Sequence, residues 1–409
     1  MHTTKNYLSD RVNRLEESAT IAMARLSREL KEQGHDVISL SLGEPDFITP
    51  DDIREAAKTA IDEGYTHYPP ISGYSDLRQS ICDKFKRENN LEFRPEQIVV
   101  STGAKQSIAN VIFSLVNPGD EVIVPAPFWV SYAQIIELAG GVPVYIPTRV
   151  EDDFKPTAGQ ISGCISEKTK LFIFSSPCNP TGTVYSKEEL RRIAEILLPH
   201  PAIWILSDEI YEHITFDAPH ESIAQFDFIR PRVVVVNGVS KGYAMTGWRI
   251  GYMAACRELA LACDKIQGQF TSGASTIAQK AAVKALNTDW KNYEYMRDSF
   301  RRRRDLVLKM MADIPGWKFN KPMGAFYVFP DVTEFFGKTD GESIIRNATD
   351  FCMYLMKDAK VSLVTGEAFG DERCVRLSFA TSDELLTEAL KRIKASLQKL
   401  HPLATETHV

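Results

Sequence analysis

The sequence lacks the features of several common protein classes. No stretch approaches the roughly 20 consecutive apolar residues that a membrane-spanning helix needs, and the opening residues MHTTKNYLSDRVNRLEES contain no apolar run of the secretory type. The 7 cysteines are scattered and odd in number, without a CxxC pair or a Cys/His spacing suited to a metal ion. We therefore expect a cytoplasmic protein with free thiols, no membrane anchor and no bound metal.

Nucleotide-binding motifs are absent as well. No GxGxxG follows a first predicted strand and no GxxxxGK[ST] occurs, which argues against a dehydrogenase and against an NTP hydrolase. The net charge of −6 argues against nucleic acid or an anionic membrane as the main partner. The one dense basic cluster, Arg301 to Arg304, lies in a helical pattern. We interpret it as a solvated or interdomain helix face rather than a phosphate-binding patch.

Apolar material is plentiful, and its pattern indicates an α/β fold. A chain of 409 residues with 44% hydrophobic residues can form a large core and is long for one domain. Short β-branched runs alternate with helical patterns, which is typical of a largely parallel sheet covered on both faces. The predicted strands are Gln97–Val100, Glu121–Val124, Pro143–Pro147, Leu171–Phe174, Ile203–Leu206, Val233–Val236 and Ile250–Ala254. From about residue 298 the pattern changes to that of a smaller α+β domain.

Polar or glycine-rich residues follow five of these strands directly. The five segments read STGAKQ, PAPFW, SSPCNPTG, SDEIY and NGVSK. In open parallel sheets, ligands bind beyond the carboxyl ends of the strands. We therefore expect these segments to share one site.

The residues of these segments suggest a particular chemistry. Lys241 follows four consecutive valines, and a desolvated lysine is a candidate amine nucleophile that forms Schiff bases. Asp208 ends an apolar strand and needs a positive or hydrogen-bonding partner if it is buried. Arg249 is suited to phosphate, as are the first backbone N–H groups of the helix predicted from Ala104. Trp129 offers a flat aromatic surface.

Together these groups describe a pocket for pyridoxal 5′-phosphate, which is bound by a lysine Schiff base and an acidic partner of its ring nitrogen. Each feature alone is weak, because a lone lysine near a strand usually lies at the surface and a DE pair usually caps a turn. Their convergence at adjacent strand ends favours the cofactor site.

Several motifs resemble those of one enzyme family. They are SKGYAMTGWRIGY, SSPCNPTG, LSDEIYEH, LGEPDFITP, HYPPISGYSDLR and VRLSFATS. The chain resembles the class I aminotransferases of fold type I, most closely the aspartate aminotransferases of subgroup Ib. The resemblance implies a mostly parallel seven-stranded sheet in a large cofactor-binding domain (residues 51–297) and a small C-terminal domain (298–409). The N-terminal segment (1–50) is expected to join the small domain.

The resemblance also implies a role for each catalytic residue. Lys241 binds the cofactor as a Schiff base and then moves a proton between Cα and C4′. Asp208 keeps the ring nitrogen protonated, so that the ring accepts the electrons left on Cα. Tyr211 and Asn179 hydrogen-bond the phenolic oxygen of the cofactor. Trp129 stacks on its ring.

Further residues are implied to bind the phosphate and the substrate. The phosphate is held by Ser240, Arg249 and the backbone of Ala104 and Lys105. Arg376 binds the α-carboxylate and, together with Trp129, orients the breaking bond, while Gly43 and Asn179 complete the pocket. Tyr68 resembles the tyrosine that reaches the cofactor phosphate of a neighbouring subunit, which implies a homodimer with shared active sites.

Simpler interpretations of these residues remain open. Tyr68 could pack in a turn, and Asn179 could be only the turn residue before Pro180. Arg376 could pair with an internal acid. Gly43 is most simply a turn glycine, whose ligand role would come through its backbone.

A dicarboxylic substrate needs a second cation, which binds its distal carboxylate, so the position of this cation indicates the substrate. Subgroup Ia uses an arginine of the partner subunit for the distal carboxylate, but the corresponding stretch QFTSGASTIAQ has none. Subgroup Ib uses the lysine of a GxKQ turn, which is Lys105 here. We therefore predict transfer of the amino group of L-aspartate to 2-oxoglutarate by a ping-pong mechanism. The alternative for Lys105 is a solvated lysine at a helix start.

Other activities on this fold remain alternatives. Some subgroup Ib relatives transaminate prephenate; Pro69 replaces their common threonine, whereas Lys155 lies where some carry a basic residue. Glutamate or aromatic amino acids could be preferred donors, and a cofactor-dependent lyase would share the same pocket. A regulator with an aminotransferase-like domain would need a helix-turn-helix segment, for which the chain has no spare length.

Overall fold

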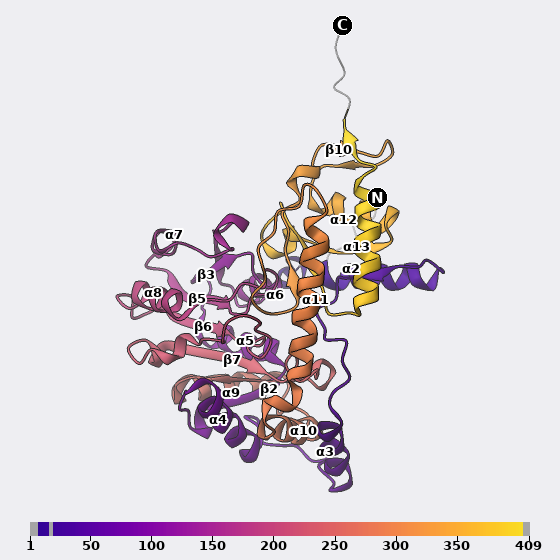
Figure 1. Ribbon diagram of the computed structural model, residues 1–409. Coiled ribbons are helices and arrows are strands. Elements are labelled where there is room, and N and C mark those ends of the chain that lie inside the picture. Colours follow the sequence, from indigo (N-terminus) through magenta and orange to yellow (C-terminus); the bar gives the residue numbers. More distant parts are fainter. Residues whose placement is uncertain (1–6, 16–18, 404–409) are drawn as a thin grey trace.

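The computed structural model describes residues 7–15 and 19–403, and a seven-stranded sheet lies at the centre of its larger part (Figure 1). Its strands are β2 (Ile98–Thr102), β3 (Glu121–Ala126), β4 (Val142–Pro147), β5 (Thr169–Ser175), β6 (Trp204–Asp208), β7 (Val233–Gly238) and β8 (Ile250–Ala254). Their order is β2-β8-β7-β6-β5-β3-β4, with β8 antiparallel to both neighbours and the other pairs parallel. Each predicted run lies in or overlaps one of these strands, so the α/β prediction is confirmed.

Both faces of the sheet are buried under helices, which explains the continuous apolar runs. Successive side chains of a strand point to opposite faces; Val233 and Val235 accordingly join one core cluster, and Val234 and Val236 join another. The first cluster includes residues of α3 (Asp51–Asp62), α4 (Ser75–Asn89), α8 (Lys187–Leu197) and α10 (Thr276–Asn287). The second includes residues of α5 (Ala104–Leu115), α6 (Ser131–Leu138) and α9 (Arg257–Phe270).

The C-terminal part has its own core and a small antiparallel sheet. The sheet contains β13 (Val364–Thr365), β14 (Val375–Ser378) and β9 (Tyr327–Val328), and the helices around it are α11 (Glu294–Ala312), α12 (Ala348–Asp358) and α13 (Asp383–Leu397). The remaining elements are α1 (Asp10–Asn13), α2 (Ala19–Glu32), α7 (Ala158–Gly163), β10 (Lys338–Thr339), β11 (Ile344–Ile345) and β15 (His401–Pro402).

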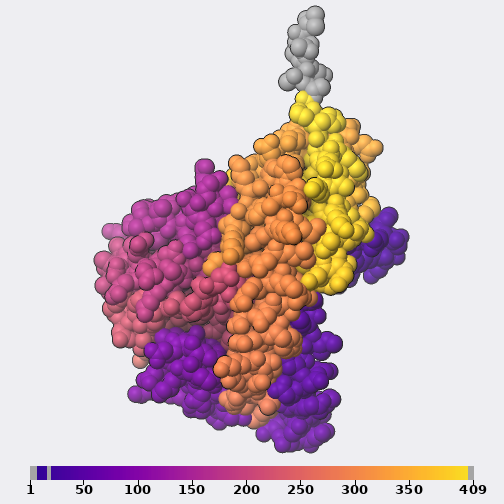
Figure 2. All heavy atoms as spheres, viewed as in Figure 1, coloured from indigo at the N-terminus to yellow at the C-terminus, as the bar shows by residue number. Residues whose placement is uncertain are grey.

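N-terminal residues lie against this C-terminal part. Strand β1 (Ile38–Ser39) pairs in parallel with β12 (Val361–Ser362). In the space-filling view the C-terminal residues, in orange and yellow, run along one side of the sheet region, with indigo N-terminal residues beside them (Figure 2). The division of the chain at residues 50 and 297 stays a prediction. Residue 297 falls inside α11. Residues 1–6 and 16–18 of the predicted N-terminal segment and residues 404–409 of the predicted small domain lie outside the described residues.

The basic cluster lies on α11, as the helical pattern predicted. Arg303 and Arg304 are buried and bind carboxylates: both terminal nitrogens of Arg303 donate to Asp46 at 2.7 and 2.8 Å, and Arg304 donates to Asp217 at 2.8 Å. The cluster thus ties α11 to the N-terminal segment through Asp46 and to a loop of the larger part through Asp217. Over the described ranges, every helix is too short or too polar to cross a bilayer.

Candidate active site

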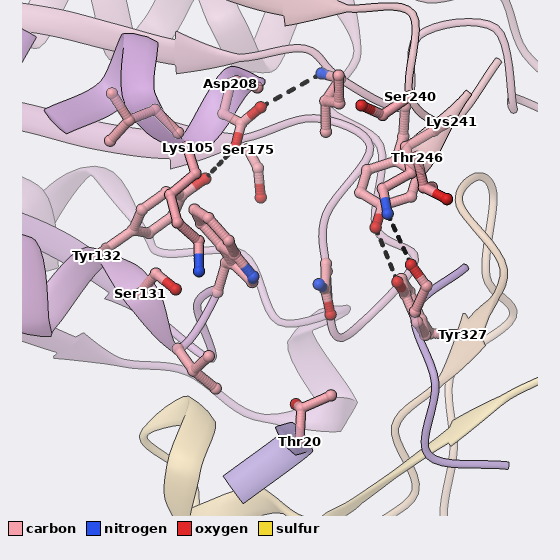
Figure 3. Close-up of a pocket in the computed structure, with 18 of the residues that line it drawn as sticks. Thr20, Lys105, Ser131, Tyr132, Ser175, Asp208, Ser240, Lys241, Thr246 and Tyr327 are labelled. Carbon is pink, nitrogen blue, oxygen red and sulfur yellow. Dashed lines mark hydrogen bonds between the residues drawn. The ribbon is translucent and has the colours of Figure 1, made fainter. Parts of the chain in front are cut away.

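A cavity of about 250 Å³ opens beyond the carboxyl ends of the parallel strands (Figure 3). Eleven of the twelve predicted site residues line it: Gly43, Ala104, Lys105, Trp129, Asn179, Asp208, Tyr211, Ser240, Lys241, Arg249 and Arg376. The twelfth, Tyr68, lies outside the cavity with 96% of its surface exposed. The structure thus brings together residues from five separate strand ends and from the small sheet.

Lys241 follows the buried strand β7 and points into the cavity. Its Nζ donates a hydrogen bond of 2.6 Å to the carbonyl oxygen of Gly43. Burial lowers the pKa of Lys241 to about 8, with smaller contributions from nearby charges. The side chain therefore offers a neutral amine at a mildly alkaline pH, which is the form that attacks a carbonyl carbon and accepts a proton.

Asp208 ends strand β6 and lies buried at the opposite side of the cavity from Lys241 (Figure 3). Its carboxylate accepts hydrogen bonds from the Tyr132 hydroxyl at 2.7 Å and from the Ile210 backbone N–H at 3.3 Å. Burial raises the pKa of Asp208 to about 6 in spite of these donors. A cationic N–H group beside it would offset this cost, because opposite charges stabilise each other strongly in a buried site.

The cavity floor near the start of α5 is built to receive an anion. The first N–H groups of a helix have no partner within the helix and carry partial positive charge. Gly103 precedes α5 with φ +82°, and a side chain there would collide with the Arg249 guanidinium. Gly251 lies so close to Ala104 that a Cβ atom would overlap its backbone nitrogen. Both glycines therefore allow Arg249, Ser240 and the helix start to converge.

Arg376 on β14 brings a buried cation to the cavity. It is 2% exposed and donates to the Asn179 side-chain oxygen at 3.0 Å and to the Ser41 carbonyl at 2.6 Å. Its Nε has no hydrogen-bond partner, and no carboxylate of the described residues lies within 4 Å of the guanidinium. Its face packs on the ring of Tyr327, 4.6 Å from the ring centroid. Among the described residues, Arg376 therefore does not form the internal ion pair that was the alternative interpretation.

Lys105 provides a second cation at the rim. Its Nζ lies 5.1 Å from the centroid of the Trp129 ring. Burial, followed by the charge of Arg249, lowers the pKa of Lys105. Within the described ranges no carboxylate is ion-paired with it. An exposed lysine at the cavity rim, without an acidic partner among the described residues, is suited to a second carboxylate of a ligand.

Sequence reasoning missed two tyrosines of the site. Tyr132 holds Asp208, and the Tyr327 hydroxyl lies 2.7 Å from that of Tyr211. Tyr132 lies on α6 among apolar residues and looked like core, while Tyr327 comes from the small sheet. The other lining residues that were missed are Thr20, Ile21, Ile108, Val130, Ser131, Ser175, Ile210 and Thr246. No local signal distinguishes these from packing residues.

These groups fit pyridoxal 5′-phosphate. An amine with a lowered pKa, a buried carboxylate, an aromatic ring and an anion cradle line one cavity. Arg249 itself adopts a left-handed backbone with φ 58°, a conformation that costs energy and is found at ligand sites. The donor set matches an aldehyde, a protonated ring nitrogen and a phosphate.

Comparisons with known proteins agree with this chemistry. The family model for aminotransferase class I and II matches residues 35–393. The chain is 46% identical to a bifunctional aspartate aminotransferase and glutamate/aspartate-prephenate aminotransferase of Petunia hybrida, covering 97% of this chain and 84% of the relative. It is also 46% identical to an aspartate/prephenate aminotransferase of Cereibacter sphaeroides, covering 95% and 98%.

Solved structures are similar over nearly the whole fold. The aspartate aminotransferase of Rhizobium meliloti superposes with a TM-score of 0.93 at 41% identity, covering 96% of this chain and 99% of that one. The Thermus thermophilus enzyme with maleate gives a TM-score of 0.90 at 38% identity, covering 96% and 100%. With a family model that spans most of its length, the chain belongs to the class I and II aminotransferases.

Proposed function

We propose that this aminotransferase transfers the amino group of L-aspartate to 2-oxoglutarate, giving oxaloacetate and L-glutamate by a ping-pong mechanism. Enzymes of this family use pyridoxal 5′-phosphate. The observation that carries the proposal is Arg376, a buried guanidinium without a carboxylate partner among the described residues, facing the same cavity as Lys241. A buried charge needs a counter-charge, and the α-carboxylate of an amino acid supplies one.

The residues around the cavity divide the work of the reaction. When bound, the cofactor supplies a ring that takes up the electron pair left on the substrate Cα. Asp208 would hold a proton at the ring nitrogen, and Ser240 and Arg249 would hold the phosphate. Lys241 would attach the cofactor through its amine, and the same amine in its free form would accept and return the proton of the substrate Cα. Trp129 covers the ring.

Orientation by Arg376 sets which bond breaks. A forked guanidinium fixes the plane of a carboxylate through two parallel hydrogen bonds. Arg376 and Lys241 line the same cavity, so an amino acid held there by its α-carboxylate would have its Cα within the space that the Lys241 amine faces. Positioning of this kind converts binding energy into rate. Asn179 and the ring of Tyr327 hold the guanidinium in place.

Replacing Arg376 by methionine is expected to lower kcat/KM by about 30- to 3,000-fold, which corresponds to about 2–5 kcal/mol for loss of a buried charge partner. The loss should be similar for aspartate and alanine, since both have an α-carboxylate. Stability should not fall, because a desolvated charge is removed. Arg373→Met is the control: Arg373 binds Asp371 at 2.6 and 2.8 Å, so this variant should lose stability and keep kcat/KM. Equal activity of Arg376→Met and the wild type would contradict the proposed carboxylate site.

The distal carboxylate of aspartate is proposed to bind Lys105. The residue is exposed at the rim, lines the cavity and has no acidic partner among the described residues. The similar Thermus thermophilus structure is described with maleate, a four-carbon dicarboxylate, which supports a dicarboxylic substrate.

Replacing Lys105 by serine should raise KM for aspartate about 10- to 100-fold, the loss of one charged hydrogen bond. KM for alanine, which has no distal carboxylate, should change less than threefold. Steady-state kinetics with both donors measures this ratio. Equal effects on the two donors would show that Lys105 acts on the cofactor phosphate instead.

The overall proposal is tested by purifying the protein with pyridoxal 5′-phosphate and screening amino donors against 2-oxoglutarate and oxaloacetate. Aspartate should be the best donor of those with short side chains. A protein that neither shows the absorption of a bound cofactor nor consumes a 2-oxo acid would refute it. Consumption of an amino acid without a 2-oxo acid would instead indicate a lyase.

Prephenate is a second candidate acceptor. The relatives from Petunia hybrida and Cereibacter sphaeroides are both named for prephenate as well as aspartate. Lys155, one residue considered for this activity, lies outside the cavity and binds both carboxylate oxygens of Glu189 at 3.0 Å. Prephenate in place of 2-oxoglutarate in the same assay decides between the single and the dual specificity.

We also propose a homodimer with shared active sites that works in the cytoplasm. The exposed ring of Tyr68 on a loop supports the first part, since an aromatic surface of this size is favourable when a partner covers it. All seven cysteines are free thiols, which suits a reducing compartment. The division into a large and a small domain near residue 297 is proposed with it.

A further inference from the structure

The turn after β6 has a second, buried face behind the active site. Asp208 and Tyr211 face the cavity, whereas Glu209 and Glu212 lie in the protein interior. The Glu209 carboxylate is held by the hydroxyls of Ser207 and Ser222 at 2.8 and 2.7 Å. The same short turn therefore places Asp208 and Tyr211 on the cavity side and the Glu209 and Glu212 carboxylates in the interior.

Glu212 is bound by a lysine from a distant helix. The ammonium group of Lys84 on α4 contacts the Glu212 carboxylate directly, and the side-chain amide of Asn89 donates to its other oxygen at 2.9 Å. Lys84 is fully buried, and it also donates to the Asn89 oxygen at 2.8 Å and lies 3.6 Å from Glu88. Burial alone would raise the pKa of Glu212, but the charges of Lys84, His213 and His220 and the hydrogen bond from Lys84 together lower it. Both charged partners are thus fixed at several points.

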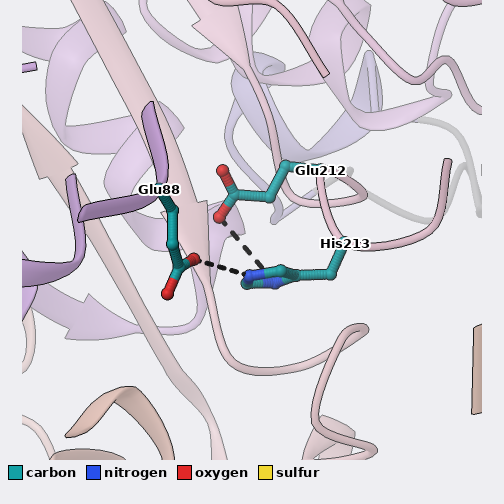
Figure 4. Close-up of side chains that lie close together, drawn as sticks. All are labelled: Glu88, Glu212 and His213. Carbon is teal, nitrogen blue, oxygen red and sulfur yellow. Dashed lines mark hydrogen bonds and ion pairs between the residues drawn. The ribbon is translucent and has the colours of Figure 1, made fainter. Parts of the chain in front are cut away.

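His213 extends this cluster to the turn that carries Lys241. Its ring lies between Glu88 and Glu212, with Nε2 at 2.9 Å from Glu88 (Figure 4). The ring stacks on Trp290 with 4.1 Å between centroids. Gly242, next to Lys241 in the chain, packs so closely on His213 that a Cβ atom there would lie 2.8 Å from Nδ1. The cluster of Lys84, Glu88, Glu212 and His213 therefore packs against the turn after β6 and the turn that carries Lys241, on the side away from the cavity.

The carboxylates of this cluster already have cationic or hydrogen-bonding partners. Glu88, Glu212 and His213 lie close enough to hold a metal ion, but the Lys84 ammonium group contacts Glu212 and lies near Glu88. A buried ion pair of this kind need not stabilise the fold, since an apolar pair of similar volume often gives the same or a higher free energy of unfolding. It does restrict where the backbone of Glu212 can lie, because charge and hydrogen-bond geometry are both demanding.

We propose that Lys84 and Glu212 are a positioning pair that fixes the turn from Glu209 to Ile214, and through it the alignment of Asp208 and Tyr211 toward the cofactor. The proposal rests on the proposed function, because the aligned residues act on that cofactor. Neither residue touches the cavity. Misplacement of a reacting group by about 1 Å costs on the order of 100-fold in rate, so a small shift of the turn is measurable.

The test replaces both charges with apolar side chains in the double variant Lys84→Met/Glu212→Leu of the holoenzyme. Its melting temperature should stay near that of the wild type. The dissociation constant of pyridoxal 5′-phosphate, from titration of the apo-protein, should rise about tenfold, and kcat with aspartate should fall about 10- to 100-fold. KM for aspartate should change less than twofold, because Arg376 and Lys105 lie on other elements. Lys84→Arg, which keeps the ion pair, should recover kcat to within threefold of the wild type.

A second Lys–Glu pair gives a matched control. Lys155 and Glu189 lie outside the cavity, and Lys155→Met/Glu189→Leu should leave cofactor affinity and kcat with aspartate unchanged. If Lys84→Met/Glu212→Leu folds with kcat and cofactor affinity within twofold of the wild type, the positioning role is wrong. If the double variant does not fold, kcat and cofactor affinity are measured for Glu212→Gln with the same twofold limit, since glutamine keeps the shape of the side chain and removes its charge. A wild type that binds no cofactor overturns the proposed function itself.

Discussion

Replacing Lys241 by alanine is expected to reduce kcat for aspartate by about 10⁴-fold or more. The amine is proposed to attach the cofactor and to act as the base at the substrate Cα; general-base catalysis alone contributes about two to four orders of magnitude, and loss of the covalent attachment adds to this. Borohydride reduction followed by peptide mapping should label residue 241 in the wild type and nothing in the variant. The phosphate contacts of Ser240 and Arg249 remain, so the variant should still bind the cofactor, more weakly.

Two controls separate this loss from unfolding. Lys105→Ala removes a cavity lysine that has no covalent role, so borohydride should still label Lys241 in it. The Lys241→Ala apo-protein should melt close to the wild type, because among the described residues the amine makes a single hydrogen bond, to Gly43, and burial already disfavours its charge. Retention of more than about 1% of the wild-type kcat would contradict the assignment of Lys241.

The large sheet was predictable because its signal is local. Each strand is a β-branched run buried on both faces, and Val233 to Val236 divide alternately between the two cores. Burial of both faces leaves little freedom in where such a run can lie. The site followed from the sheet, because the carboxyl ends of parallel strands meet at one edge. Asp208, Lys241 and Trp129 could therefore be grouped before any contact was known.

Other parts of the site depend on contacts that the sequence does not encode locally. Tyr132 lies in the same helical pattern as Ile135 and Ile136, and only the three-dimensional fold turns its hydroxyl toward Asp208. Tyr327 reaches Tyr211 from a sheet more than 100 residues away in the chain. The role of Arg376 rested on the family resemblance, and the absence of a described acidic partner became visible only in the structure.

Charge pairs were equally hard to anticipate. Lys84 is one of two lysines in the pattern SDLRQSICDKFKREN and looks like a surface residue, yet it is fully buried against Glu212. The partner is 128 residues away, and a helix pattern with four charged residues nearby gives no reason to single it out. The sequence correctly placed Arg303 and Arg304 on a helix. It did not reveal that the carboxylates of Asp46 and Asp217 bind them.

Replacing Asp208 by asparagine is expected to abolish most activity and, in the apo-protein, to increase stability at alkaline pH. Burial raises the pKa of Asp208 from 3.8 to about 6, so the folded chain binds this proton more tightly than the unfolded chain does. The stability that protonation contributes is complete below about pH 4 and is lost as the pH rises through 6. At pH 8 the rise in pKa corresponds to about 3 kcal/mol per chain. Asparagine keeps an oxygen for the Tyr132 hydroxyl and carries no charge, so it removes this cost.

Two measurements on Asp208→Asn test whether the charge of Asp208 lowers the stability of the apo-protein and supports its activity. The melting temperature of the apo-protein should exceed that of the wild type at pH 8 and equal it near pH 4, while kcat with aspartate should fall at least about 100-fold because the ring nitrogen loses its anionic partner. Asp217→Asn provides the opposite sign: hydrogen bonds from Arg304 and Lys321 lower the pKa of Asp217 to about 2, so this variant should melt lower at pH 8 and keep its kcat. An Asp208→Asn protein that is less stable than the wild type at pH 8 would mean that the carboxylate is compensated within the apo-protein, and the case for a cationic ring nitrogen beside it would lose its physical basis.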